Sequence, residues 1–201
     1  EAEFLENTAD TRKDLRVVVG LDISGSTSIP VDRKTEKGPK VIDVEKQFAL
    51  IFARALGALT PNIDVYGFNS MTATNVYHAK PIEALSSFVS DCANRDGDFI
   101  RYITHILSAA RADVKYFFLI TDGQPSSVNY EGKYALDDTL LAMRECRKAG
   151  IRLVYFNIDS ELRDYFGFFK AEASYAEYFA DPHDLVDVIP KLVESIASEI
   201  V

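Results

Sequence analysis

The 201-residue sequence contains no tryptophan and only two cysteines, Cys92 and Cys146. Neither cysteine has a second Cys or a His at the spacing of a zinc site, and a pair of cysteines cannot form a framework of several disulfides. We therefore expect two free thiols in a reducing compartment. This predicts a cytoplasmic protein, with an extracellular location as the alternative.

Long hydrophobic runs and an excess of positive charge are also missing. Apolar residues make up 47% of the chain, but they come in short clusters, and none approaches the roughly 20 residues that span a bilayer. Acidic residues outnumber basic ones by 31 to 22, and the net charge of −9 repels a phosphate backbone. We therefore expect neither membrane insertion nor a nucleic-acid partner.

The sequence lacks the motifs of common hydrolases as well. No Gly-x-Ser-x-Gly turn surrounds Ser24 or Ser26, and no Gly-x-x-x-x-Gly-Lys-Ser/Thr phosphate loop is present. A dehalogenase-type phosphatase needs a second acid two residues after its nucleophilic Asp, but Ser24 stands there after Asp22. The three histidines form no ligand pair or triad. We expect no enzymatic activity, and a Mg²⁺-dependent phosphatase-like enzyme is the weakest alternative.

What the chain does contain is an alternation of strand and helix patterns. Runs of Val, Ile, Leu and aromatic residues predict strands over 16–23, 62–68, 76–80, 115–121, 152–158 and 175–179. Apolar residues at helical spacing predict helices over 41–59, 82–92, 98–112, 136–149, 162–168 and 183–200. This alternation is typical of an α/β, Rossmann-like three-layer sandwich, with helices on both faces of a mostly parallel sheet of about six strands. The strand over 76–80 follows a short connection and is the expected antiparallel edge strand.

The chain is short enough for one domain, since single cores tend to divide beyond roughly 250–300 residues. Residues 1–14 are polar, lack periodicity and do not begin with Met, so we interpret them as a linker or an artificial extension. Residues 15–201 are the predicted domain. Within it, the stretch over 28–40 is rich in Pro, Gly and charge, and we favour a disordered insertion over an ordered basic loop built on Arg33, Lys34, Lys37 and Lys40.

Oxygen-bearing side chains follow two of the predicted strands at the point where each strand ends. Asp22, Ser24 and Ser26 come after the first strand, and Asp122 follows the strand over 115–121. If the two strands are neighbours, about 4.8 Å apart, these side chains converge at one edge of the sheet. Two carboxylates that are forced together repel each other, and a divalent cation relieves that repulsion. An all-oxygen set suits Mg²⁺ first, with Mn²⁺ or Ca²⁺ as alternatives.

These residues predict binding rather than bond cleavage. Serine hydroxyls carry no charge, so a cation held by two of them and one or two aspartates keeps much of its positive character. Such a cation can accept a Glu or Asp side chain of a partner protein at an open coordination position. The alternative, a polar turn in which Asp22 only caps backbone groups, is less favoured because Asp122 stands in the matching place.

The two motifs together resemble the metal-ion-dependent adhesion site of von Willebrand factor A domains, which combines Asp-x-Ser-x-Ser with a later Thr-Asp-Gly. A closer resemblance is to the A domains of nitric-oxide-reductase-activation, Rubisco-activation and cobaltochelatase-type proteins. It is carried by residues 21–27, 41–45, 66–68, 95–97, 121–125, 130–134 and 149–152. Those families work beside MoxR-type AAA+ ATPases. The resemblance implies an adaptor that couples such an ATPase to a target metalloenzyme or complex; an extracellular adhesion module is the alternative.

One position departs from the family pattern. The usual adhesion site takes a Thr from the loop before the middle helix, and this chain has Asn94-Arg95-Asp96-Gly97 there. We expect Asp96 or Asn94 to take the place of that Thr through water, and a third carboxylate would lower the positive charge left on the cation. The expected contacts to a partner flank the motifs and are Thr27, Gly123, Gln124 and Tyr130.

Overall fold

The computed structural model describes residues 12–32, 35–158 and 163–201. Its centre is a six-stranded sheet in the order β5-β4-β1-β6-β7-β8, in which β5 is antiparallel to β4 and the other pairs are parallel. The strands are β1 (Leu15–Asp22), β4 (Ile63–Ser70), β5 (Thr74–His78), β6 (Val114–Thr121), β7 (Arg152–Asn157) and β8 (Tyr175–Tyr178). The predicted mostly parallel sheet with one antiparallel edge strand is confirmed.

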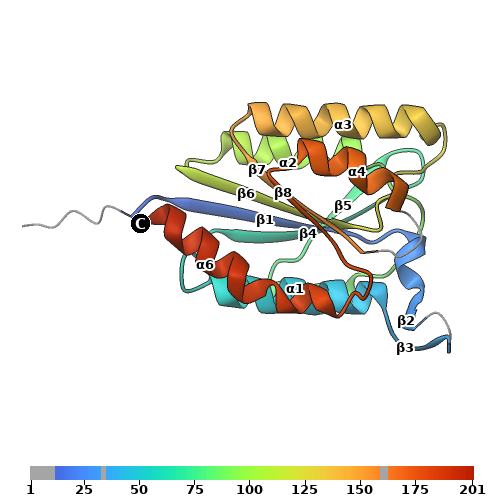
Figure 1. The fold of residues 1–201 in the computed structure, drawn as a ribbon, viewed down its shortest axis with the longest axis horizontal. Helices are drawn as coiled ribbons and strands as arrows, with labels where there is room; N and C mark the ends of the chain where they lie inside the picture. The colour runs from blue at the N-terminus through green and yellow to red at the C-terminus, as the bar shows by residue number, and fades with distance from the viewer. Residues whose placement is uncertain (1–11, 33–34, 159–162) are drawn as a thin grey trace, which may run out of the picture.

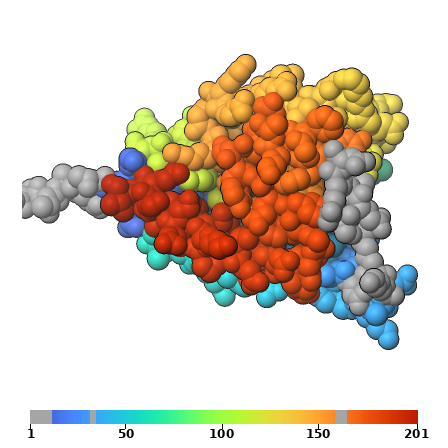
Figure 2. All heavy atoms as spheres, in the orientation of Figure 1, coloured from blue at the N-terminus to red at the C-terminus, as the bar shows by residue number. Residues whose placement is uncertain are grey.

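Helices cover both faces of this sheet (Figure 1). One face carries α1 (Val41–Leu56), α5 (Asp184–Asp187) and α6 (Ile189–Ile200), and the other carries α2 (Asp96–Ala109), α3 (Gly132–Lys148) and α4 (Arg163–Glu172). Figure 2 shows that the C-terminal segment, which ends in α6, hides the sheet in this view. In the described part of the chain, no helix has the length and apolar character needed to cross a membrane.

The central strands are mostly apolar because both of their faces are buried. Val17 and Val19 of β1 and Phe118 of β6 belong to the core under α1 and α6. Val18 and Phe117, each one residue away, belong to the second core under α2 and α3. Successive side chains of a strand point to opposite faces, so one continuous apolar run fills two cores at once.

Two predicted helices differ from the structure. The segment predicted as a helix over 82–92 forms only a 3₁₀ turn, η2 (Ile82–Ser87). Only Leu85 and Phe88 of that segment are fully buried, and such limited packing does not hold a longer helix in place. The closing helix predicted over 183–200 is divided into α5 and α6, and Pro190 stands in the first turn of α6, where its missing N–H is tolerated.

The stretch predicted to be disordered is the third difference. It contains the end of a 3₁₀ turn, η1 (Gly25–Ser28), and a two-stranded hairpin of β2 (Pro30–Asp32) and β3 (Lys37–Lys40). The hairpin projects from the end of the molecule at which β1 ends (Figure 1). Arg33 and Lys34, part of the predicted basic loop, lie outside the described residues, as do residues 1–11 of the predicted N-terminal segment.

Candidate functional site

The two sequence motifs meet at the carboxyl edge of the sheet, because β1 and β6 are parallel neighbours. Leu21 pairs with Ile120, so Asp22 stands beside Thr121, the last residue of β6, and Asp122 directly follows that strand. Asp22 is completely buried and Asp122 is 5% exposed. The two strands are adjacent, as the convergence of the motifs requires. One aspartate at the end of each strand therefore lies at the same edge of the sheet.

The carboxylate of Asp22 is held by neutral donors from three segments. Its Oδ1 accepts the backbone N–H of Ser24 at 2.8 Å. Its Oδ2 accepts the side-chain amide of Asn94 at 2.8 Å and the hydroxyl of Thr121 at 3.0 Å. These bonds fix the orientation of Asp22 but bring no positive charge to it.

The two serines of the first motif lie together on the turn η1. The hydroxyl oxygens of Ser24 and Ser26 are 3.0 Å apart. Ser24 is buried, whereas Ser26 is exposed. The turn is closed by Thr27, whose N–H and hydroxyl both donate to the carbonyl oxygen of Ser24. Two hydroxyl oxygens and a carboxylate are thereby held at one end of β1, and one of the hydroxyls is open to solvent.

Asn94, just before α2, and Asp96, the first residue of α2, bring a further carboxylate to Asp22. The side-chain amide of Asn94 donates to Asp22 and, at 3.0 Å, to Oδ1 of Asp96, while its carbonyl oxygen accepts the N–H of Ser126 at 3.0 Å. Asn94 therefore acts as a bridge that orients two carboxylates. Oδ2 of Asp96 is buried and has no hydrogen-bond partner among the described residues.

A sharp turn follows Asp122 and depends on Gly123. The φ angle of Gly123 is +87°, a conformation that residues with a Cβ rarely adopt. A Cβ at this position would also lie 1.9 Å from the side-chain nitrogen of Asn157. The N–H of Gln124, at the far side of the turn, donates to Asp122 at 3.3 Å. Gly123 is thus a structural requirement of the site.

Burial and mutual repulsion disfavour the charged forms of these carboxyl groups. Burial, followed by the negative charge of Asp122, raises the pKa of Asp22 from 3.8 to about 7. The pKa of Asp96 is also raised, first by burial and then by the charges of Asp22 and Asp122. A cation between these groups would remove the repulsion and favour their charged forms.

The donor set suits a hard cation that retains water. Within the described ranges, no three His, Cys, Asp or Glu side chains are placed to hold a metal ion by themselves. A cation at this edge would therefore need the hydroxyls of Ser24 and Ser26, and water, beside the carboxylates. Mg²⁺ commonly binds through one or two carboxylates and keeps several waters. The unpartnered Oδ2 of Asp96 also fits a nearby cation or its water.

Three of the four residues predicted to bind a partner, Thr27, Gly123 and Tyr130, are buried in the free domain, and their part in partner binding stays a prediction. Tyr130 contacts the first turn of α2, which contains Asp96. Its hydroxyl accepts the N–H of Gly97 at 3.2 Å and donates to Asp138 of α3 at 2.8 Å. Gln124 is exposed beside the site and keeps its expected role as a candidate contact.

Sequence reasoning missed several residues that shape the site. Thr121 was noted only as part of a motif, yet its hydroxyl bonds Asp22 and accepts the N–H of Gly123 at 3.1 Å. Asp138 lies in the middle of α3 and could be connected to the site only through the buried hydroxyl of Tyr130. The role of Thr121 could have been inferred from its position directly before Asp122. Nothing in the sequence pointed to a role for Asp138.

Comparison with known proteins gives relatives and a fold. No family model matches the chain. Protein NorD of Stutzerimonas stutzeri is 29% identical over 174 residues, which are 81% of this chain and 28% of that protein. Protein NorD of Brucella abortus (strain 2308) is 27% identical over 175 residues, which are 81% of this chain and 27% of that protein. The chain thus spans just over a quarter of the length of these curated relatives.

Solved structures with little sequence identity share the fold. The vWF domain of the type V pili tip protein Mfa5 from Porphyromonas gingivalis gives a TM-score of 0.72 at 8% identity, covering 94% of this chain and 97% of that one. The conserved hypothetical protein BatB from Bacteroides thetaiotaomicron gives 0.63 at 14% identity, covering 92% and 98%. The PilB minor pilin from Streptococcus sanguinis gives 0.72 at 14% identity, covering 96% and 63%. The chain has a von Willebrand factor A-like fold, as its motifs predict.

Proposed function

We propose that this domain is a Mg²⁺-dependent protein-binding module. The observation that carries the proposal is the cluster at the carboxyl edge, where Asp22 and Asp122 lie at the ends of neighbouring strands beside the paired hydroxyls of Ser24 and Ser26. When bound, the cation supplies positive charge that attracts an acidic side chain of a partner. The exposed Ser26 and Gln124 make this edge accessible from outside.

Each residue of the cluster has a defined part in the proposal. Asp22 and Asp122 provide the negative charge, and Ser24 and Ser26 provide neutral oxygen ligands that leave the cation partly positive. Asn94 orients Asp22 against Asp96. Asp96 acts through water, and its charge limits the attraction for a partner carboxylate.

We further propose that the module is an adaptor that couples a MoxR-type AAA+ ATPase to a metalloenzyme or another target complex in the cytoplasm. Similarity to the two NorD proteins over 81% of the chain supports this reading, together with the sequence segments beyond the metal motifs. Cys92 and Cys146 are free, which favours the adaptor over an extracellular adhesion module. We propose binding rather than catalysis because Ser24 occupies the position of the second acid of a phosphatase.

Calorimetric titration of Mg²⁺, Mn²⁺ and Ca²⁺ into chelator-treated protein tests the metal site. We expect saturable one-to-one binding by the wild type and none by Asp22→Ala, because this change removes the carboxylate at the centre of the cluster. A control is Glu194→Ala on the exposed side of α6, which should bind as the wild type does. A wild type that binds no cation at millimolar concentration contradicts the proposal.

Partner capture tests the binding role. The double change Ser24→Ala with Ser26→Ala should abolish Mg²⁺-dependent capture of a co-expressed MoxR-type ATPase and leave the fold intact, as measured by circular dichroism. Capture that survives both the double change and a chelator would show that the partner binds elsewhere on the domain.

A further inference from the structure

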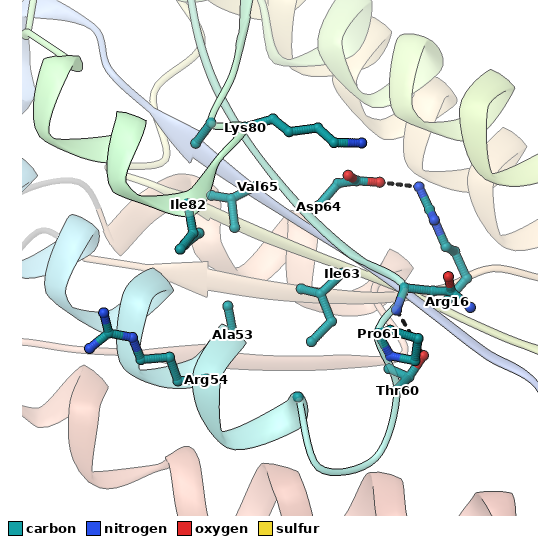
Figure 3. Close-up of a pocket in the computed structure, with 13 residues that line it drawn as sticks. Arg16, Ala53, Arg54, Thr60, Pro61, Ile63, Asp64, Val65, Lys80 and Ile82 are labelled. Carbon is teal, nitrogen blue, oxygen red and sulfur yellow. Dashed lines mark hydrogen bonds and ion pairs between the residues drawn. The ribbon is translucent and has the colours of Figure 1, made fainter.

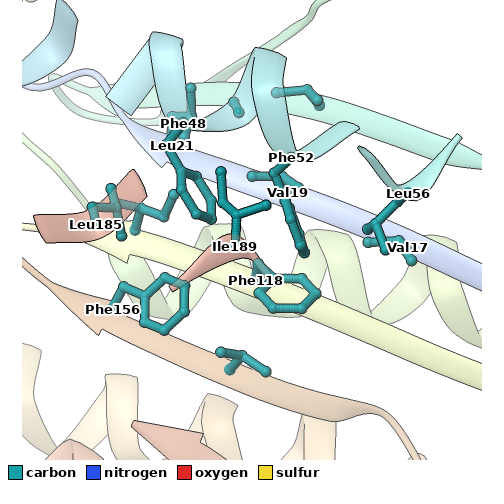
Figure 4. Close-up of a cluster of buried hydrophobic side chains, with 14 of the residues drawn as sticks. Val17, Val19, Leu21, Phe48, Phe52, Leu56, Phe118, Phe156, Leu185 and Ile189 are labelled. Carbon is teal, nitrogen blue, oxygen red and sulfur yellow. The ribbon is translucent and has the colours of Figure 1, made fainter. Parts of the chain in front are cut away.

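A fourth carboxylate, Glu45, lies near the candidate cation site on the opposite side of the sheet from Asp96. Figure 4 shows Phe48 of α1 beside Leu21 of β1, Phe52 beside Val19, and Leu56 beside Val17. The helix and β1 therefore lie side by side and run in opposite directions. One turn of the helix, about 5.4 Å, covers about the same length as two residues of the strand.

The same progression places Glu45 at the end of β1. Glu45 precedes Phe48 by three residues, so its side chain lies on the buried face of α1, where the helix passes the strand end at Asp22. The N-terminus of α1 is fastened to the same region by a backbone bond from the N–H of Val41 to the carbonyl oxygen of Ile29, which directly follows η1.

The carboxylate of Glu45 is completely buried, and neither of its oxygens has a hydrogen-bond partner among the described residues. Buried charges in proteins are normally paired or bound to a metal. Burial, followed by the negative charges of Asp22 and Asp122, raises the pKa of Glu45 well above its usual value, and Lys46 offsets this only in part. The side chain therefore lies among negative groups, with both oxygens available.

We propose that Glu45 is an outer ligand of the cation, which it reaches through cation-bound water from the α1 side of the sheet. The inference rests on the proposed function. Water mediates the contact because no three acidic side chains of the described residues are placed to share one metal ion directly. Asp96, with its unpartnered Oδ2, is the corresponding group on the α2 side. Each helix layer thus contributes one buried carboxylate to a site whose inner ligands come from the strand ends.

The alternative role for Glu45 is purely structural, as a protonated group packed under α1. The two roles differ in how metal-free and metal-loaded protein respond to Glu45→Gln, which keeps the shape of the side chain and removes its charge. An outer ligand is needed only when the cation is bound, whereas a packing residue is needed in both states.

The test combines calorimetric Mg²⁺ titration with thermal unfolding of Glu45→Gln, with and without Mg²⁺. We expect Mg²⁺ affinity to fall about 10- to 100-fold, the usual effect of losing an outer-shell partner. The Tm of the metal-free protein should stay the same or rise, because an unpaired buried acid is removed. Glu45→Met, which fills the same space without polar atoms, replaces Glu45→Gln if that variant does not fold. Glu83→Gln, at an exposed glutamate, is the matched control.

The outcomes separate this inference from the proposed function. Tight binding by the wild type and equal binding by Glu45→Gln overturn the role of Glu45 and leave the cation site standing. A fall in affinity accompanied by a lower Tm of the metal-free protein also overturns it, since Glu45 then acts through the fold. A wild type that binds no cation overturns both proposals.

Discussion

The carboxylates at the two ends of strand β1 differ in the charge of their partners. At the beginning of the strand, Arg16 forms an ion pair with Asp64 at the rim of a pocket of about 420 Å³ (Figure 3), and His78 contacts the other oxygen of Asp64 at 3.0 Å. At the end of the strand, Asp22 has only neutral donors. Among the described residues, neither Asp96 nor Glu45 forms an ion pair with Lys, Arg or His. The carboxylate at the beginning of the strand is paired with a cationic side chain of the chain itself, whereas our proposal gives those at the other end a cation from solution.

The largest expected effect is on how the free energy of unfolding of the metal-free protein depends on pH. The pKa of Asp22 is about 7 in the folded state against 3.8 for the free group, so the folded protein binds the extra proton between these values. Relative to Asp22→Asn, the free energy of unfolding of the wild type should fall by on the order of 4 kcal/mol as the pH rises from 4 to 7. Urea unfolding at several pH values measures it.

Saturating Mg²⁺ should remove most of that decline, because the cation favours the charged form of Asp22. The matching comparison at the other end of β1 is Asp64→Asn, which keeps Asp22 and should therefore show the same Mg²⁺-sensitive decline as the wild type. An identical slope in the wild type and in Asp22→Asn would mean that Asp22 titrates normally and that the two ends do not differ.

Gly123→Ala should lower the free energy of unfolding by about 3 kcal/mol, because the new side chain would have to adopt a positive φ and would also clash with a neighbour. The clash is with Asn157, and it should also abolish saturable Mg²⁺ binding by displacing Asp122. Gly132→Ala is the matched control, since Gly132 has a φ of +56° and no atom within 4 Å of an added Cβ. Its cost should be about 1 kcal/mol, without loss of binding. Equal costs in urea unfolding would show that the clash at Gly123 is relieved.

Tyr130→Phe should cost about 1–2 kcal/mol, because the buried hydroxyl serves both Gly97 and Asp138. Since Gly97 follows Asp96, Mg²⁺ affinity should also fall several-fold, as measured by calorimetry. Tyr134→Phe, at a tyrosine that is 59% exposed, is the control and should change neither quantity. Unchanged affinity in Tyr130→Phe would show that the α2 loop keeps its place without this contact.

The smallest effect should come from Asp64→Asn at the beginning of β1. The pair with Arg16 is partly exposed, and such pairs contribute up to about 1 kcal/mol. Mg²⁺ affinity should not change, because the paired carboxylate lies at the opposite end of the strand. A change in affinity would show that the two ends are coupled through the sheet.

The sheet and the strand-end motifs could be predicted because they depend on local patterns. Strands β1 and β6 each contain an uninterrupted run of apolar residues in their interior, Val17–Val19 and Tyr116–Ile120, which identifies central strands with two buried faces. Once both strands are parallel neighbours, the convergence of Asp22 and Asp122 follows from the chain direction alone. The predicted helix over 82–92 failed because its apolar spacing was real but too few of its side chains reach the core.

The roles of Tyr130, Thr27 and Glu45 could not be predicted because burial is decided by contacts between distant segments. Tyr130 is separated from Gly97 by 33 residues, and nothing in its own loop indicates that its hydroxyl turns inward. Glu45 lies at a helical position that sequence patterns assign to the core, where an acid looks like an exception. The role proposed for Glu45 depends on Asp22 and Asp122, which come near it only in the folded chain.

The β2–β3 hairpin is attached next to the candidate site but is only weakly constrained by the core. Its ends are held together at the entrance by the bond between Val41 and Ile29, next to the metal motif. All four residues of β3 are exposed, so the core does not constrain the sequence of this strand. Doubling the length of such a loop costs only about 0.6 kcal/mol in closure entropy. The hairpin can therefore tolerate substitutions and insertions that leave the carboxylates beside it unchanged.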